Sequence, residues 1–135
     1  MQDVREAWCV DAACSGNPGP MEYRCVHLPS RREVFRFGPI PGTNNIGEFL
    51  AIVHALALQR QQGLSIPIYS DSMTAQTWVR NRKAKTTLTR TEKTAQALDL
   101  VARAENWLRE NGVTLPVLKW DTEQWGEIPA DFGRK

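Results

Sequence analysis

Three carboxylates in this chain stand where folding could bring them together. Asp11 ends the apolar run 7–10 and precedes small residues and a turn rich in glycine and proline, which is typical of a buried strand that ends in an acid. Asp71 ends a second apolar run, 66–70, and Glu48 lies in the first turn of a predicted helix. Because ligands of open α/β sheets bind beyond the carboxyl ends of the strands, Asp11 and Asp71 could share one crevice and form two arms of a metal site.

Each acid also has a purely structural interpretation. Asp11 could be a solvated acid at a strand end, and Asp71 could cap the helix that follows it. Asn45 and Glu48 fit a capping box, in which the acid only ties down the start of the helix. A fourth acid, Asp131, lies in the tail and indicates nothing by itself. Taken alone, none of these motifs favours a metal site over local structure.

The length and composition predict one domain, 1–135, with a formal net charge of +2 and enough chain to bury a core. No apolar run is long enough to cross a membrane, and the polar start is unlike a signal peptide. Cys9, Cys14 and Cys25 show neither a paired metal-ligand spacing nor a disulfide framework. We therefore expect a reduced, cytoplasmic protein that is a monomer and has no membrane partner.

The elements that must position the acids begin with strands. After the opening strand, the runs 23–28 and 33–37 are rich in aromatic and branched residues, and a polar loop separates them as in a hairpin. Residues 38–42 contain two glycines and two prolines and are expected to break regular structure.

Helices and strands alternate in the rest of the chain. Apolar residues at helical spacing from Ile46 to Ala57 predict a first helix, with Asn44 or Asn45 as its N-cap and Gly63 as its stop. The later predicted elements are a strand over 66–70, a helix from 71–72 through 79, a helix from about 91 to 111, a strand over 115–120, and a tail with at most a short helix.

This order predicts the fold class. Strands joined by short loops pair antiparallel, whereas strands separated by helices pair parallel through right-handed crossovers. The expected architecture is α/β, with a mixed five-stranded sheet flanked by helices.

The chain resembles type 1 ribonuclease H through four motifs in the right order and spacing: DAACSGNPGP at 11–20, TNNIGE at 43–48, YSDS at 69–72 and AD at 130–131. The resemblance spans nearly the whole chain and implies the ribonuclease H-like sheet, in a short form without the long basic protrusion that some members carry. It also implies an endonuclease that hydrolyses the RNA strand of an RNA/DNA hybrid and leaves 5′-phosphate products.

The resemblance assigns roles to the four acids. Asp11, Glu48, Asp71 and Asp131 would be catalytic and would hold two Mg²⁺ ions, for which Mn²⁺ substitutes. Mg²⁺ prefers oxygen ligands, and two ions about 4 Å apart can activate a water and stabilise the departing oxygen. No nucleophilic side chain is then required.

The same resemblance assigns substrate contacts. Asn17, Asn44 and Asn45 would contact the hybrid across its minor groove, where ribose 2′-hydroxyls distinguish RNA from DNA, and Thr43 would hold a DNA phosphate. Cys14 is also expected to bind the substrate. The alternative for these polar side chains is turn formation and helix capping, and both roles can hold at once.

One departure from the family pattern concerns a loop histidine. Many members carry it before the fourth acid, but the loop 120–125 has none, and Glu123 or Asp121 could take its role. His27 and His54 match no family position and are expected to be structural.

A second departure is a shortened basic stretch. Its cationic side chains could simply form a solvated face. They could instead contact phosphates, because neutralisation of phosphates drives affinity for nucleic acids. These side chains are Arg80, Arg82, Lys83, Lys85, Arg90 and Lys93.

The tail is the third departure, because no long final helix follows Asp131 to anchor it. The bulky segment 125–129 is expected to pack against the sheet instead.

Two other functions compete with hydrolysis. A catalytically weak or inactive module could bind hybrids or duplex RNA on the same fold, and the missing histidine is its only support. A small-molecule-binding α/β domain, with the acids as caps, leaves Asp131 unexplained and lacks a phosphate-binding glycine fingerprint.

Overall fold

The computed structural model describes residues 6–132 and contains the predicted mixed sheet of five strands, in the order β3-β2-β1-β4-β5. β1, β2 and β3 pair antiparallel, whereas β4 and β5 continue from β1 in parallel. The strands are β1 (Trp8–Cys14), β2 (Gly19–His27), β3 (Glu33–Gly42), β4 (Ile68–Ser70) and β5 (Val117–Lys119).

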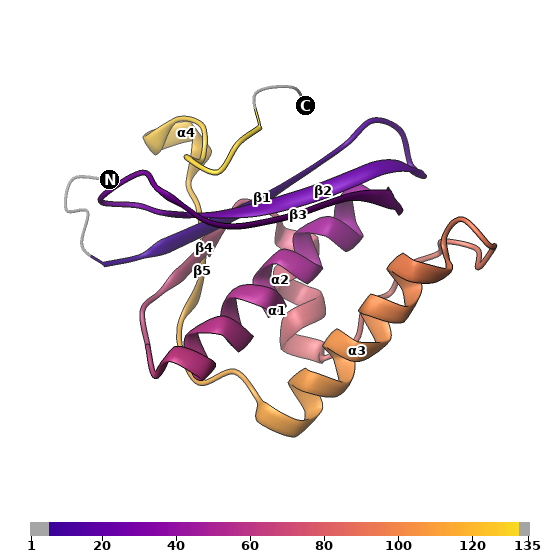
Figure 1. Ribbon diagram of the computed structural model, residues 1–135. Helices are drawn as coiled ribbons and strands as arrows, with labels where there is room; N and C mark the ends of the chain where they lie inside the picture. The colour runs from indigo at the N-terminus through magenta and orange to yellow at the C-terminus, as the bar shows by residue number, and fades with distance from the viewer. Residues whose placement is uncertain (1–5, 133–135) are drawn as a thin grey trace.

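Helices cover the sheet unequally on its two faces. The three longer helices lie on one face, and the short α4 lies on the other, together with residues 126–132 (Figure 1). The helices are α1 (Asn44–Gln62), α2 (Met73–Asn81), α3 (Ala95–Asn111) and α4 (Thr122–Trp125). None of the helices in the described part of the chain is both long and apolar enough to span a bilayer.

The alternation of side chains along β1 divides the core into two layers. Val10 and Ala12 belong to the layer beneath α1, α2 and α3. Cys9 points the other way, into a smaller layer that contains Trp120 and Ile128. Asp11 has the same parity as Cys9, so the tail and α4 pack on the face of β1 from which Asp11 projects.

The expected break at 38–42 is wrong, because β3 continues to Gly42. Pro39 and Pro41 are tolerated because β3 is an edge strand, where a missing N–H need not interrupt the ladder. A register shift between Met21 and Tyr23 accommodates the irregular residues, and Gly38 has a φ of +104°. A Cβ on Gly38 would lie 2.6 Å from the carbonyl oxygen of Met21, so glycine is required there.

The N-terminal cap of α1 also differs from the expectation. Thr43, not Asn44 or Asn45, is the N-cap, and its Oγ1 accepts a hydrogen bond of 3.2 Å from the Ile46 N–H. The predicted stop is confirmed, because Gly63 caps the other end in the left-handed conformation that glycine adopts easily.

The third helix begins later than predicted, at Ala95 rather than near Thr91. The side chains of Thr91 and Thr94 hydrogen-bond to nearby backbone groups, and the Thr94 hydroxyl donates to the Thr89 carbonyl over 2.7 Å. Such local bonds offer the backbone an alternative to the helix. β4 and β5 are likewise shorter than the runs 66–70 and 115–120.

Gly47 sets how closely α1 approaches β1. A Cβ at this position would lie 2.9 Å from Cβ of Ala12 and 3.0 Å from Sδ of Met21, inside normal contact distance. The absence of a side chain therefore brings the start of α1 against β1, next to Asp11.

Candidate metal and nucleic-acid site

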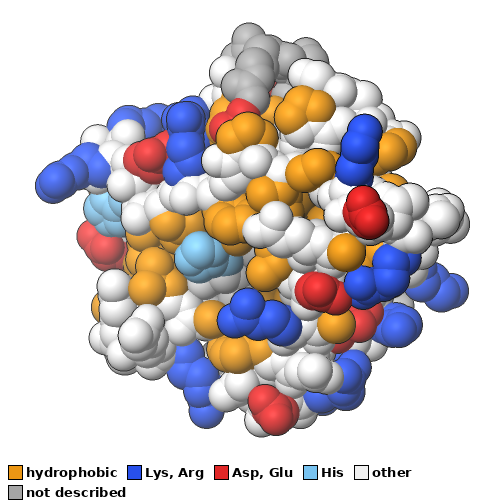
Figure 2. Space-filling view, turned by 45° about the vertical axis from the view of Figure 1, so that its right-hand side comes forward, with side chains coloured by type: hydrophobic (Ala, Val, Ile, Leu, Met, Phe, Trp, Pro, Cys, Tyr) orange, Lys and Arg blue, Asp and Glu red, His pale blue; other side chains and the backbone are white. Residues whose placement is uncertain are grey.

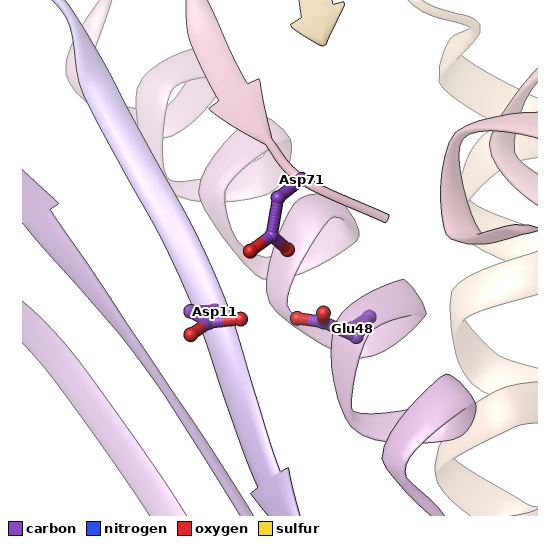
Figure 3. Close-up of side chains that lie close together, drawn as sticks. All are labelled: Asp11, Glu48 and Asp71. Atoms are coloured by element: carbon purple, nitrogen blue, oxygen red, sulfur yellow. The ribbon is translucent and has the colours of Figure 1, made fainter. Parts of the chain in front are cut away.

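Asp11, Glu48 and Asp71 form one cluster, and they are three of the four acids that the sequence assigned to a metal site. One carboxylate oxygen from each lies within 4.8 Å of the others. Figure 3 shows the three side chains converging from β1, α1 and the end of β4. Asp11 is fully buried and Glu48 is 3% exposed, whereas Asp71 is partly exposed. The cluster is therefore open to solvent on the side of Asp71.

The pairing of two parallel strands explains the cluster. β1 and β4 pair from Trp8 with Ile68 to Val10 with Ser70, where the ladder ends. Asp11 directly follows Val10, and Asp71 directly follows Ser70. Both carboxylates therefore stand at the carboxyl end of the paired part of the two strands. Ligand sites of α/β sheets occur at this position.

The structural interpretations of two acids are excluded. Ser72, not Asp71, caps α2, because its Oγ accepts a hydrogen bond of 3.0 Å from the Ala75 N–H. Thr43 is the cap of α1, so Asn45 and Glu48 do not form the capping box that the sequence allowed. Glu48 instead lies one turn into α1, on the side that faces β1.

Asp131 is not part of the group of three carboxylates that converge within 4.8 Å. Its backbone lies on the same face of the sheet, where Arg24 donates to the carbonyl oxygens of Ala130 and Asp131 at 2.7 and 2.6 Å. Arg24 is the residue of β2 directly opposite Asp11. Arg24 was not predicted as a functional residue, because its only signal in the sequence is its position in an alternating strand.

The segment without a histidine forms α4 rather than a loop. Asp121 caps this helix, with its Oδ1 accepting from the Gln124 N–H at 3.2 Å. Trp120, Trp125 and Tyr69 form an edge-to-face aromatic cluster beneath it, with ring centroids 5.1–6.0 Å apart. Glu123 is exposed in the first turn of α4. Asp121 is thus committed to capping, whereas Glu123 projects into solvent.

Both histidines have structural partners, as expected. His27 bonds Ser30 through Nδ1 and the Glu6 carboxylate through Nε2. His54 stacks on Phe35 with ring centroids 3.9 Å apart, and its Nδ1 lies 2.8 Å from the Tyr23 hydroxyl. Burial lowers the pKa of His54 below its usual value, which favours a neutral ring in this aromatic group.

A groove of about 1100 Å³ runs beside the start of α1. Asn17, Thr43, Asn44 and Asn45 line it, together with Lys85, Lys93 and several threonines of the segment 86–94. The Asn17 Oδ1 accepts a hydrogen bond of 3.0 Å from the Asn44 N–H, which ties the β1–β2 turn to α1. Cys14 does not line the groove, and its thiol donates to the Gly16 carbonyl at 2.7 Å.

The cations of the basic stretch are divided between surfaces. Lys85 and Lys93 line the groove, whereas Arg80 and Arg82 line a separate hollow of about 290 Å³. Lys83 lies 3.7 Å from the Glu105 carboxylate. On the face seen in Figure 2, Lys and Arg side chains stand apart, with Asp and Glu between them. The threonines that line the groove were not predicted as functional residues, and their only signal in the sequence is the recurrence of Thr in 86–94.

Comparison with known proteins gives consistent matches. The RNase H family profile matches residues 4–119. A ribonuclease H of Cupriavidus metallidurans is 34% identical over 95 residues, covering 67% of this chain and 65% of that protein, just under two thirds of its length. A ribonuclease H of Maricaulis maris is 28% identical over 126 residues, covering 90% of this chain and 85% of that protein.

A solved structure of a ribonuclease H1 isolated from compost by a metagenomic approach has a similar fold. It superposes with a TM-score of 0.55 at 17% identity, covering 90% of this chain and 88% of that one. The family match contains Asp11, Glu48 and Asp71 and ends before Asp131.

Proposed function

The chain belongs to the ribonuclease H family of hydrolytic nucleases, and we propose that it is a metal-dependent endonuclease for the RNA strand of RNA/DNA hybrids. The observation that carries this proposal is the cluster of Asp11, Glu48 and Asp71. Three carboxylates brought together in a folded protein repel one another, and a bound cation offsets that cost. The groove beside the start of α1 provides room for a nucleic acid, although none of these three acids lines it.

The donor set fits Mg²⁺. Asp11, Glu48 and Asp71 offer only oxygen ligands, which are the ligands that Mg²⁺ prefers, and the partly exposed Asp71 leaves space for water and substrate. We infer that these residues, with Asp131, hold two Mg²⁺ ions, and that Mn²⁺ substitutes. When bound, the ions supply Lewis-acid stabilisation of the phosphate and a water activated for attack. The carboxylates fix the ligand geometry, and no side chain forms a covalent intermediate.

The groove supports the recognition of a hybrid. Asn17, Asn44 and Asn45 present amide groups that can bond the 2′-hydroxyls by which RNA differs from DNA. Thr43, at the start of α1, stands where backbone N–H groups and the helix dipole favour a phosphate. We propose that Cys14 acts with them, although its thiol points to the backbone of the turn that carries Asn17.

Cleavage of a labelled RNA/DNA hybrid tests the proposed function. With Mg²⁺, the protein should cut the RNA strand of the hybrid, leave the DNA strand intact and produce 5′-phosphate ends. Duplex RNA, duplex DNA and a reaction with a chelator are the controls. Binding of the hybrid without cleavage, in either Mg²⁺ or Mn²⁺, would make the protein a binding module and contradict the enzyme assignment.

The salt dependence of hybrid binding should identify the cations that contact phosphates. We expect the double change Lys85→Gln and Lys93→Gln to weaken binding regardless of sequence and to flatten the log–log salt slope by roughly two units, because each phosphate contact contributes about one. Fluorescence anisotropy over a salt series measures the slope.

Arg80 and Arg82 provide the matched pair, because they line the separate hollow. The sequence-based prediction that Arg80, Arg82 and Lys83 contact the phosphates of the nucleic acid remains a prediction. A slope that flattens only with Arg80→Gln and Arg82→Gln would place the hybrid on the smaller hollow, and an unchanged slope in both pairs would return these cations to a solvated face.

Glu123 is proposed to assist the reaction in place of the missing histidine. It projects into solvent from α4, so Glu123→Ala should leave hybrid affinity nearly intact and lower turnover by about 10-fold or more, at or just below the range of a placed acid or base. Glu123→His should retain or raise activity. Steady-state cleavage of one hybrid measures each variant.

Asp121→Asn is the companion variant, because Asn preserves the cap of α4 while removing the charge. Slow turnover in Asp121→Asn with normal turnover in Glu123→Ala would move the role to Asp121. Wild-type rates in both would mean that neither acid replaces the histidine.

A further inference from the structure

The side chain of Arg24 binds the backbone of the tail at Ala130 and Asp131. Its Nε donates to the Ala130 carbonyl at 2.7 Å, and its Nη2 donates to the Asp131 carbonyl at 2.6 Å. The planar guanidinium thus holds two successive carbonyl groups, a geometry that the single ammonium of lysine does not reproduce. The backbone on both sides of the Asp131 α-carbon is therefore tied to one side chain.

Two further contacts steady the same guanidinium. Its Nη1 lies 3.6 Å from the Glu33 carboxylate on β3, and its Cζ lies 5.1 Å from the centre of the Phe132 ring. Cations over aromatic rings are attracted by the ring quadrupole. Arg24 thus contacts three consecutive residues of the tail, and only about a fifth of its side chain is exposed.

The position of Arg24 links this contact to the site. It is the β2 residue directly opposite Asp11, and residues opposite each other in an antiparallel pair project from the same face with Cβ atoms about 4.5–5.5 Å apart. Ile128 and Ala130 are buried against that face in the smaller core layer. Packing thus places the tail near Asp11, but apolar contacts alone do not set the direction of the Asp131 backbone.

We propose that Arg24 is a positioning residue that orients the Asp131 carboxylate toward the Asp11–Glu48–Asp71 cluster by holding the carbonyl groups on either side of it. The proposal rests on the proposed function, in which Asp131 is the fourth ligand. It explains how an acid that lies outside the helices and strands of residues 6–132 is held in place. The role is one of positioning, because the hydrogen bonds of Arg24 go to the backbone of the tail.

A double-mutant cycle tests this role. Losing a residue that orients a metal ligand typically costs 10–100-fold in metal affinity or activity, so Arg24→Ala should lower kcat by roughly that factor and raise the Mg²⁺ midpoint of activity, with little change in KM. In an Asp131→Asn background, Arg24→Ala should have almost no further effect on kcat, because the carboxylate on which it acts is already absent.

The increase in melting temperature produced by Mg²⁺ gives a readout independent of catalysis. Arg24→Ala and Asp131→Asn should each reduce this increase, and the double variant should reduce it no more than Asp131→Asn alone. If the variants show this pattern in their response to Mg²⁺ but the wild type cleaves no hybrid, the proposed function fails while the positioning role of Arg24 stands. An increase that Asp131→Asn leaves unchanged would overturn the inference.

Arg36→Ala is the matched control. Like Arg24, Arg36 contacts Phe132 and Glu33: its Cζ lies 5.2 Å from the centre of the Phe132 ring, and its Nε lies 3.2 Å from the Glu33 carboxylate. The hydrogen bonds to the carbonyl groups of Ala130 and Asp131, however, come from Arg24. We expect Arg36→Ala to keep the kcat and the Mg²⁺ response of the wild type.

A purely structural anchor would behave differently. Arg24→Ala would then lower the melting temperature equally with and without Mg²⁺, and the folded protein would keep its kcat. Additive losses in the cycle would also overturn the proposal. Should Arg24→Ala not fold, Arg24→Lys replaces it in the same cycle, because one donor remains, and a partial loss that Asp131→Asn abolishes is the result expected.

Discussion

Replacing Asp71 with Asn is expected to abolish hybrid cleavage while raising the melting temperature of the metal-free protein. The Asp71 carboxylate lies within 4.8 Å of those of Asp11 and Glu48, and like charges at this distance destabilise the folded state. Asn keeps the shape and removes one charge, so relief of about 1 kcal/mol would raise the melting temperature by roughly 4 °C.

The loss of cleavage has the same cause. Asn is a weaker ligand than a carboxylate, and a metal site that supplies several kcal/mol of transition-state stabilisation should lose roughly 10³-fold or more in rate without it. The stabilisation by Mg²⁺ should also be smaller in Asp71→Asn than in the wild type, because a ligand stabilises only in proportion to its affinity for the folded state.

Scanning calorimetry with and without Mg²⁺, together with single-turnover cleavage, measures both effects. Asp99→Asn is the matched variant, since Asp99 is an acid on the exposed side of α3 that pairs with Arg90 at 2.8 Å. It removes the same charge far from the cluster and should change neither cleavage nor the response to Mg²⁺. A lower melting temperature for Asp71→Asn that does not change with Mg²⁺ would mean that Asp71 only stabilises the local structure.

Enlarging Gly47 is the second change with a large expected effect, because it acts on stability and on the site together. A Cβ at this position would already lie 2.9 Å from Cβ of Ala12 and 3.0 Å from Met21, and the branched side chain of valine would fill still more of this contact. Overpacking of this kind costs about 1–3 kcal/mol, and near its upper end the melting temperature of Gly47→Val should fall by roughly 10 °C.

The same displacement should disturb catalysis in the protein that remains folded. Glu48 follows Gly47 directly, so moving the start of α1 away from β1 moves Glu48 away from Asp11. A shift of about 1 Å in a reacting constellation can cost roughly 10²-fold, and we expect a comparable fall in kcat below the new melting temperature.

Ala57→Val supplies the comparison on the same helix. Ala57 is half-buried, and the change introduces the same side chain on the same helix; Ala→Val lowers helix propensity, whereas Gly→Val raises it. Thermal melts and kcat at a temperature where all variants are folded should separate the two positions. Equal losses at Gly47 and Ala57 would show that a valine side chain anywhere on this helix, and not the approach of α1 to β1 at Gly47, explains the loss.

The amino-acid sequence by itself determined the order and type of the elements and placed two of the acids at strand ends. Periodicity of two or 3.6 residues marks strands and helices locally, and Asp11 and Asp71 follow apolar runs that must be strands. Gly63 ends α1 for a local reason, since glycine adopts the left-handed conformation at little cost. These features depend on neighbours in sequence, so pattern and spacing are sufficient to predict them.

Only the tertiary structure decided which distant residues meet. β3 runs through Pro39 and Pro41 because it lies at the edge of the sheet, a position that no local pattern encodes. Arg24 holds Ala130 and Asp131 across more than 100 positions of sequence because the β1–β2 register sets it opposite Asp11. Register and strand order arise from packing of the whole core, and so the support of the site, unlike its acids, becomes visible only once the chain is folded.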